Sequence, residues 1–146
     1  MKIFIITLLL SVSVYSQIFD FGKGETQPGF IRVNESDIYT KEKGYGFETG
    51  QNVKCTDRKK DDKLIPDNCS SDSPFYFSVK VSEGNYRVII TYGDVGNDTQ
   101  IAVKAELRRL MLPITETKKG QFKTVEFIVN VRNPQISTGG IVKLKD

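Results

Sequence analysis

Apolar residues occupy every second position through most of the second half of the chain. The alternation is clearest in four segments of about seven residues, which are Phe75–Val81, Tyr86–Tyr92, Ile101–Leu107 and Val125–Val131. A period of two places the apolar side chains of a strand on one face and the polar ones on the other. No segment shows the 3.6-residue period of an amphipathic helix over three turns. The pattern therefore predicts an all-β fold, a β-sandwich of the jelly-roll type.

Turn residues indicate where the expected strands begin and end. Glu83–Asn85 separates the first two alternating segments and predicts a β-hairpin between them. In the first half, Ile18–Gly22, Phe30–Val33 and Gly44–Phe47 are predicted as short strands, and Thr49–Ser73 as a long loop. Because glycine alternates with aromatic residues in Gly44–Phe47, we expect a strand or bulge there in which the backbone approaches a ligand closely.

The beginning of the chain has the pattern of a secretory signal peptide. Residues 1–16 combine a basic start, the apolar run Ile3–Leu10 and a small polar stretch. A membrane anchor is the alternative, but this run is far shorter than the roughly 20 residues that span a bilayer. We therefore expect a secreted protein, periplasmic or extracellular, with one β-sandwich domain over residues 17–146. Since Ile141–Lys145 begins a further predicted strand that stops near Asp146, we expect this sandwich to lack its last strand.

The chain has 2 cysteines, Cys55 and Cys69, on either side of its most polar segment. In a secreted protein they can form a disulfide, and closing a loop of about 15 residues is worth about 3 kcal/mol in the chain-entropy model. Two free thiols are the alternative.

The chain has no histidine, which excludes several kinds of chemistry. Ser-His-Asp and Cys-His nucleophilic pairs and His-ligated zinc all require imidazole. Two cysteines are too few for an all-cysteine zinc site. The densest basic cluster, Arg58–Lys60, is flanked by Asp57, Asp61 and Asp62, so no nucleic-acid partner is expected.

Several runs carry a resemblance to a known family. In the first half these are Phe19–Gly22, Pro28–Phe30, Ile38–Thr40 and Gly44–Phe47. In the second half they are Gly84–Val88, Tyr92–Asp94, Ala105–Met111 and Phe127–Val131. This ordered set, which covers most of residues 17–146, resembles the N-terminal module of secreted bacterial rhamnogalacturonan acetylesterases, carbohydrate esterases of the GDSL/SGNH group.

The resemblance implies a galactose-binding-like β-sandwich without catalytic function. In that family an esterase domain follows the module and carries a Gly-Asp-Ser nucleophile motif and a later Asp-x-x-His motif. Neither motif occurs in this chain, and Gly93–Val95 begins like the first but has no serine. The implied partners are a C-terminal esterase domain or a pectic polysaccharide.

Sugar binding requires an aromatic face for the apolar side of the ring and polar groups for the hydroxyls. Tyr39, Tyr45, Phe47 and Asp94 are the candidate carbohydrate-binding residues, and Asn97 and Asp98 add polar groups beside Asp94. The alternative, which we favour, is that Tyr45 and Phe47 pack in the core and that the Asp and Asn residues shape a turn.

Acidic residues offer two further interpretations. A structural calcium ion could take oxygens from Asp20, Glu35, Asp37 and Asp94, but scattered acids without a binding-loop spacing are usually surface residues, so no metal site is predicted. Glu106 and Glu126 could act as paired carboxylates of a glycosidase, although exposed surface positions are favoured.

These observations lead to one main functional hypothesis and two alternatives. The main one is a noncatalytic accessory or carbohydrate-binding module of a secreted rhamnogalacturonan acetylesterase-like enzyme, so we expect no enzyme activity from this chain alone. The first alternative is a free-standing secreted sugar-binding or cell-surface adhesion protein. The second is a histidine-independent hydrolase that uses two carboxylates.

Overall fold

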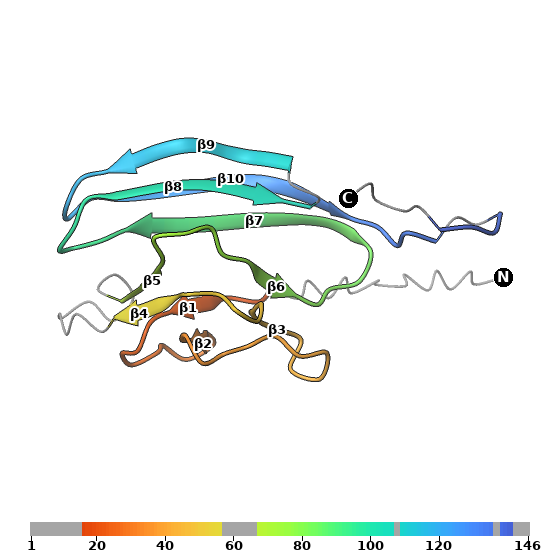
Figure 1. Ribbon diagram of the computed structural model, residues 1–146, viewed down its shortest axis with the longest axis horizontal. Coiled ribbons are helices and arrows are strands. Elements are labelled where there is room, and N and C mark those ends of the chain that lie inside the picture. The colour runs from red at the N-terminus through yellow and green to blue at the C-terminus, as the bar shows by residue number, and fades with distance from the viewer. Residues whose placement is uncertain (1–15, 57–66, 107–108, 136–137, 142–146) are drawn as a thin grey trace, which may run out of the picture.

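The computed structural model describes residues 16–56, 67–106, 109–135 and 138–141, and these residues form ten strands and no helix. The strands lie in two groups (Figure 1): the short strands β1 to β6 form one layer, and the longer strands β7 to β10 form the other. The all-β sandwich predicted from the alternation is confirmed. Within the part of the chain that the structure describes, no helix has the length and apolar character needed to cross a membrane.

The first layer consists of three short two-stranded ladders. Strand β1 pairs in parallel with β2, whereas the β3–β6 and β4–β5 ladders are antiparallel. Cys55 lies directly opposite Cys69 in the β4–β5 ladder, and the two form a disulfide. The strands are β1 (Phe19–Phe21), β2 (Ile31–Val33), β3 (Tyr45–Phe47), β4 (Lys54–Thr56), β5 (Asn68–Ser70) and β6 (Phe77–Val79).

The second layer consists of two longer antiparallel ladders. Strand β7 (Gly84–Gly93) pairs with β10 (Phe122–Val131) without a break in register. Strand β8 (Thr99–Ala105) pairs with β9 (Arg109–Thr117), with register shifts between Ile101 and Lys104. Proline cannot donate a ladder hydrogen bond, so Pro113 in β9 is typical of an edge strand.

The hydrophobic core lies in the first layer. Its buried residues are Val33, Phe47, Val53 and Cys55, and half-buried side chains from β1, β3, β5 and β6 pack against them. The aromatic rings meet edge to face or tilted, and the Phe21–Phe77 pair, whose centroids are 4.9 Å apart, is edge to face. In the second layer, Tyr92 is the buried hydrophobic residue among those described.

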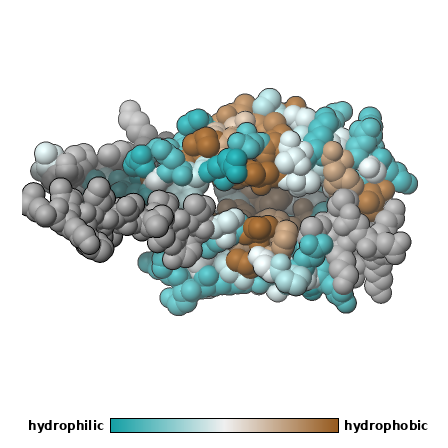
Figure 2. All heavy atoms as spheres, turned by 180° about the vertical axis from the view of Figure 1, so that it is seen from behind, coloured by the Kyte–Doolittle hydropathy of each residue, from teal (hydrophilic) through white to brown (hydrophobic). Residues whose placement is uncertain are grey.

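A side-chain hydrogen bond joins the two layers. Asn68 Nδ2, from β5, donates a 2.7 Å hydrogen bond to Asp94 Oδ2, in the loop after β7. Figure 2 shows hydrophobic residues gathered on both sides of a hollow in the face seen from behind. The half-buried side chains of β7 and β10 alternate with exposed ones, as the period of two predicts.

The predicted hairpin between Phe75–Val81 and Tyr86–Tyr92 is wrong. Strand β6 pairs instead with β3, where Phe77 lies opposite Phe47 and both rings pack in the core. Strand β7 begins at Gly84, inside the predicted turn, and forms a ten-residue ladder with β10. Both pairings join segments far apart in the sequence. The β3–β6 pairing brings aromatic rings together in the core, and the β7–β10 pairing forms a longer ladder than the predicted hairpin would.

Other predictions for single segments have mixed outcomes. The strands predicted at residues 18–22, 30–33, 44–47, 101–107 and 125–131 are present, with shifted ends. The predicted loop Thr49–Ser73 is wrong in part, because it contains β4 and β5. The disulfide is confirmed, and the free-thiol alternative is wrong. The signal peptide lies outside the described residues except for Ser16, and so does the strand predicted at residues 141–145, except for Ile141, which forms a bridge with Gln135.

Candidate functional site

Three of the four predicted carbohydrate-binding residues lie in or beside β3. On the side of β3 away from β6, Tyr39 N donates a 2.8 Å hydrogen bond to Phe47 O, and Phe47 N donates one of 2.8 Å to Asp37 O. A Cβ atom on Gly46 would lie 2.5 Å from Tyr39 N, so only glycine fits there. The close approach predicted for Gly44–Phe47 therefore exists, but its partner is the chain's own backbone at residues 37–39.

The aromatic rings of β3 are largely occupied by other side chains. Phe47 is 1% exposed and belongs to the core, as the favoured alternative predicted. The half-buried Tyr45 ring packs against Phe19, with centroids 5.3 Å apart, and the Lys43 ammonium group lies 4.9 Å from its centroid. The role of Tyr39, Tyr45 and Phe47 in sugar binding stays a prediction.

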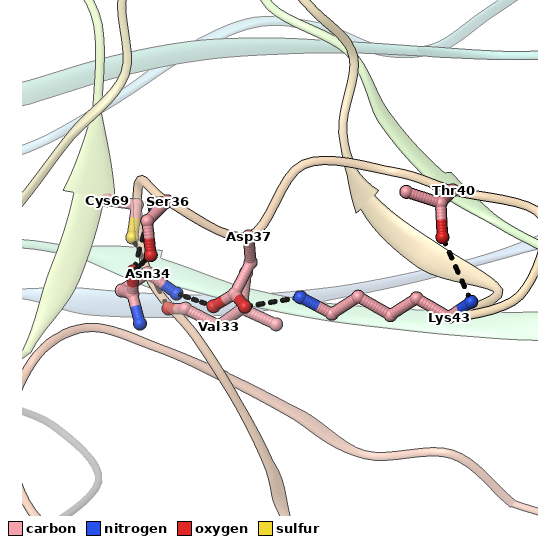
Figure 3. Close-up of polar contacts among 7 residues, drawn as sticks. All are labelled: Val33, Asn34, Ser36, Asp37, Thr40, Lys43 and Cys69. Carbon is pink, nitrogen blue, oxygen red and sulfur yellow. Dashed lines mark hydrogen bonds and ion pairs between the residues drawn. The ribbon is translucent and has the colours of Figure 1, made fainter.

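The segment that carries Tyr39 is held by a carboxylate at its centre (Figure 3). Asp37 accepts a 2.7 Å hydrogen bond from Asn34 N and forms an ion pair with Lys43. Thr40 Oγ1 accepts a 3.1 Å bond from Lys43 N. These contacts fix the turn before β3 and place Lys43 beside the ring of Tyr45.

The fourth candidate, Asp94, lies in the loop between β7 and β8. It is 5% exposed, and its carboxylate accepts hydrogen bonds from Asn97 N at 3.1 Å, from Gly96 N at 2.5 Å and from Asn68 Nδ2. A carboxylate that binds the amide groups two and three residues ahead shapes a turn, as the alternative interpretation stated. The sequence contains the local part of this pattern, but nothing in it signals the bond to Asn68, 26 positions earlier. A sugar-binding role for Asp94 stays a prediction.

The four acidic residues considered for calcium do not form a metal site. Asp20 accepts a 3.0 Å hydrogen bond from Thr26 Oγ1, Glu35 pairs with Lys23, and Asp37 pairs with Lys43. Among the described residues, no three metal-ligating acidic or cysteine side chains lie together. Since calcium takes six to eight oxygens, these separately paired carboxylates do not fit it.

The two glutamates considered for glycoside hydrolysis are held by different partners. Glu106, after β8, accepts a 2.9 Å hydrogen bond from Asn130 N and lies 3.4 Å from Arg109 Nη1. Glu126, in β10, is exposed and pairs with Arg87 across the β7–β10 ladder at 3.9 Å. Each carboxylate therefore has an arginine partner of its own, and the role of Glu106 and Glu126 as paired catalytic carboxylates stays a prediction.

Comparison with known proteins identifies the family. A family model described as "Beta-agarase/YXIM esterase-like, galactose-binding domain-like" matches residues 17–137. The chain belongs to this family of galactose-binding-like domains. The resemblance to the N-terminal module of a bacterial esterase is thereby confirmed, while the rhamnogalacturonan acetylesterase assignment stays a prediction.

The galactose-binding-like domain is similar to part of one bacterial protein. It is 36% identical over 92 residues to the uncharacterized esterase YxiM of Bacillus subtilis (strain 168), a match that covers 60% of this chain and 23% of YxiM. A crystal structure of the YxiM protein of Bacillus subtilis matches with a TM-score of 0.54 and 29% identity, over 77% of this chain and 31% of that one. The chain thus spans about a quarter to a third of these relatives.

The galactose-binding-like domain also exposes an aromatic side chain that the sequence analysis did not single out. Tyr76, just before β6, is 62% exposed. The alternation in Phe75–Val81 places it on the face opposite Phe75 and Phe77, which contact Phe47 in the core. The period of two in this segment therefore indicated that the Tyr76 side chain points outward, but nothing in the sequence indicated a function for it.

Proposed function

We propose that this chain is a noncatalytic, carbohydrate-binding accessory module of a secreted carbohydrate esterase. The observation that carries the proposal is the match of residues 17–137 to the galactose-binding-like domain of the beta-agarase/YxiM esterase-like family. A β-sandwich of this kind supplies a rigid surface for a polysaccharide, and the ester bond is cut by another domain. The module holds the substrate near that domain.

The composition supports a binding role without catalysis. With no histidine and no Gly-Asp-Ser motif, the chain lacks the base and the nucleophile motif of the esterases that it resembles. The relative YxiM is called an esterase, and the match covers only 23% of it. The proposal assigns ester hydrolysis to a partner domain and none to this chain.

The proposed ligand is a pectic polysaccharide of the rhamnogalacturonan type. The resemblance of the ordered runs from Phe19–Gly22 to Phe127–Val131 to rhamnogalacturonan acetylesterases supports this ligand. The signal-peptide pattern of residues 1–16 supports secretion, and so does the Cys55–Cys69 disulfide, because disulfides persist in oxidising compartments.

Affinity electrophoresis tests the proposal directly. The chain is run through native gels that contain rhamnogalacturonan, dextran or no polysaccharide, beside an unrelated protein of similar charge. We expect its migration to slow with increasing rhamnogalacturonan and to stay unchanged in dextran. Equal mobility in all three gels would overturn the proposed ligand class.

A further inference from the structure

Tyr76 has an aromatic ring on the surface and a backbone that is fixed from two sides. Its N–H donates a 3.1 Å hydrogen bond to Gln51 Oε1, and its carbonyl accepts one of 3.1 Å from Glu48 N. The ring therefore projects from a positioned backbone although the side chain is 62% exposed. Because this backbone is already ordered, only the side-chain torsions of Tyr76 lose freedom when a ligand stacks on the ring.

Polar side chains lie next to this ring on the same ladder. Phe47 pairs with Phe77, so Glu48 follows opposite Tyr76, and Ser78 lies opposite Gly46. The Ser78 hydroxyl donates a hydrogen bond to Glu48 Oε1, which fixes the carboxylate on the outer face. Glu48, Gln51 and Ser78 are half-buried, so their polar ends are restrained but still reach the surface.

We propose that Tyr76, Glu48 and Gln51 form the carbohydrate-binding site of this module, an inference that rests on the proposed function. The tyrosine ring packs against the apolar C–H face of one pyranose ring. The Glu48 carboxylate accepts hydrogen bonds from sugar hydroxyls, and the Gln51 amide nitrogen donates to them. The ligand is a neutral or partly acetylated pyranose unit of a polysaccharide, bound on an open surface.

This assignment differs from the one made from the sequence. Phe47 lies in the core, Tyr45 packs against Phe19 and Lys43, and Asp94 is 5% exposed. A sugar needs a free ring face and polar groups that are accessible from the same side. The surface around Tyr76 meets both requirements with residues that come after β3 (Glu48 and Gln51) and just before β6 (Tyr76).

The test measures binding of rhamnogalacturonan by isothermal titration to the full chain and to five variants, one of which is Tyr39→Ala. We expect Tyr76→Ala to weaken binding about tenfold or more and Tyr76→Phe to keep it, because the ring and not the hydroxyl makes the stacking contact. Glu48→Gln should weaken binding by a smaller factor. Ile114→Ala, a change at a 70% exposed position in β9, is the matched control and should leave binding unchanged.

The outcomes separate this site from the proposed function. If the unaltered chain binds no rhamnogalacturonan, both proposals are overturned. If it binds and Tyr76→Ala binds equally well, the site is overturned and the function stands. Loss of binding on Tyr39→Ala with none on Tyr76→Ala would assign the site to the residues predicted from the sequence. An unfolding midpoint unchanged by Tyr76→Ala shows that lost binding is not lost folding.

Discussion

The two layers of this domain are stabilised in different ways. The layer of β1 to β6 has strands of only three residues, yet it contains the core of Val33, Phe47, Val53 and Cys55, the aromatic contacts and the disulfide. The layer of β7 to β10 has strands of seven to ten residues and long backbone ladders, but its inward side chains are mostly half-buried. Long strands are therefore not where the densest packing lies.

The difference indicates which interactions hold each layer. Burial of apolar surface and of aromatic rings contributes most to folding, whereas a backbone hydrogen bond adds about 1 kcal/mol net because it replaces one with water. We infer that single side-chain changes in the first layer cost more than equivalent changes in the second. The predictions below test this difference from its largest expected effect to its smallest.

A matched pair of phenylalanines gives the strongest contrast. Phe47→Ala in β3 removes a fully buried ring and should lower the free energy of unfolding by about 3–5 kcal/mol, the range for a large core truncation. Phe127→Ala in β10 removes a half-buried ring and should cost about half as much. Urea denaturation of both variants provides the comparison, with Phe47→Leu as a milder change if Phe47→Ala fails to fold. Equal losses would remove the distinction between the layers.

Removing the disulfide should have the next largest effect. Replacing both Cys55 and Cys69 with serine releases a cross-link of sequence separation 14 and should cost about 3 kcal/mol in the chain-entropy model. The shift of the urea midpoint measures the loss, and the neighbouring exposed change Ser70→Ala is the control. A midpoint that does not move would show that the β4–β5 ladder holds this layer without its cross-link.

The next prediction concerns the hydrogen bond between Asp94 and Asn68, which connects the two layers. Asp94→Ala leaves the half-buried donors of Asn68 and Gly96 without their acceptor and should cost about 1–3 kcal/mol. Asp98→Ala, in the same loop, removes an exposed carboxylate and should change the free energy of unfolding much less. Thermal unfolding of the two variants decides the point, because equal losses would mean that Asp94 is not a specific link.

The smallest expected effect depends on pH. Burial raises the pKa of Asp20 above its ordinary value of 3.8, with Asp67 adding to the rise, while the bond from Thr26 and the charge of Arg32 oppose it. As the pH rises, Asp20 therefore loses its proton at a lower pH in the unfolded chain than in the folded protein. Ionisation of Asp20 lowers the free energy of unfolding. Relative to the unaltered protein, Asp20→Asn should gain stability between about pH 4 and pH 7.

Asp98→Asn should show the opposite sign. The bonds from Lys118 and from Lys119 N lower the pKa of Asp98, so its contribution is present near neutral pH and is lost as the pH falls through the acid range. Denaturation of both variants at pH 3, 5 and 7 measures the two slopes. Slopes of the same sign would contradict the assigned environments.

The sequence predicted the second layer better than the first. The period of two in Tyr86–Tyr92, Ile101–Leu107 and Val125–Val131 marks β7, β8 and β10, because each strand has one face toward the other layer. Strands of three residues such as β4 and β5 are too short to show a period, and they lie in a polar segment that resembles a loop. Cys55 and Cys69 lie opposite each other in the β4–β5 ladder, and the sequence did suggest their disulfide.

The strand pairing and the proposed surface site could not be predicted from the sequence, for a different reason. Nothing local in Phe75–Val81 indicates that β6 pairs with β3, because that choice depends on the core that Phe47 and Phe77 build together. Which aromatic rings are buried likewise depends on contacts between distant segments. The sequence analysis named Tyr45 and Phe47 as sugar-binding candidates while favouring core positions for both, and it did not single out the exposed ring of Tyr76.

One measurement tests most directly whether this chain binds an acetylated polysaccharide without hydrolysing its ester bonds. The purified chain is mixed with insoluble, acetylated rhamnogalacturonan, and the bound protein and the released acetate are measured in the same sample. The account predicts that the protein leaves the supernatant while acetate stays at the level of the buffer blank. Acetate above that level, or protein that remains entirely in solution, would contradict it.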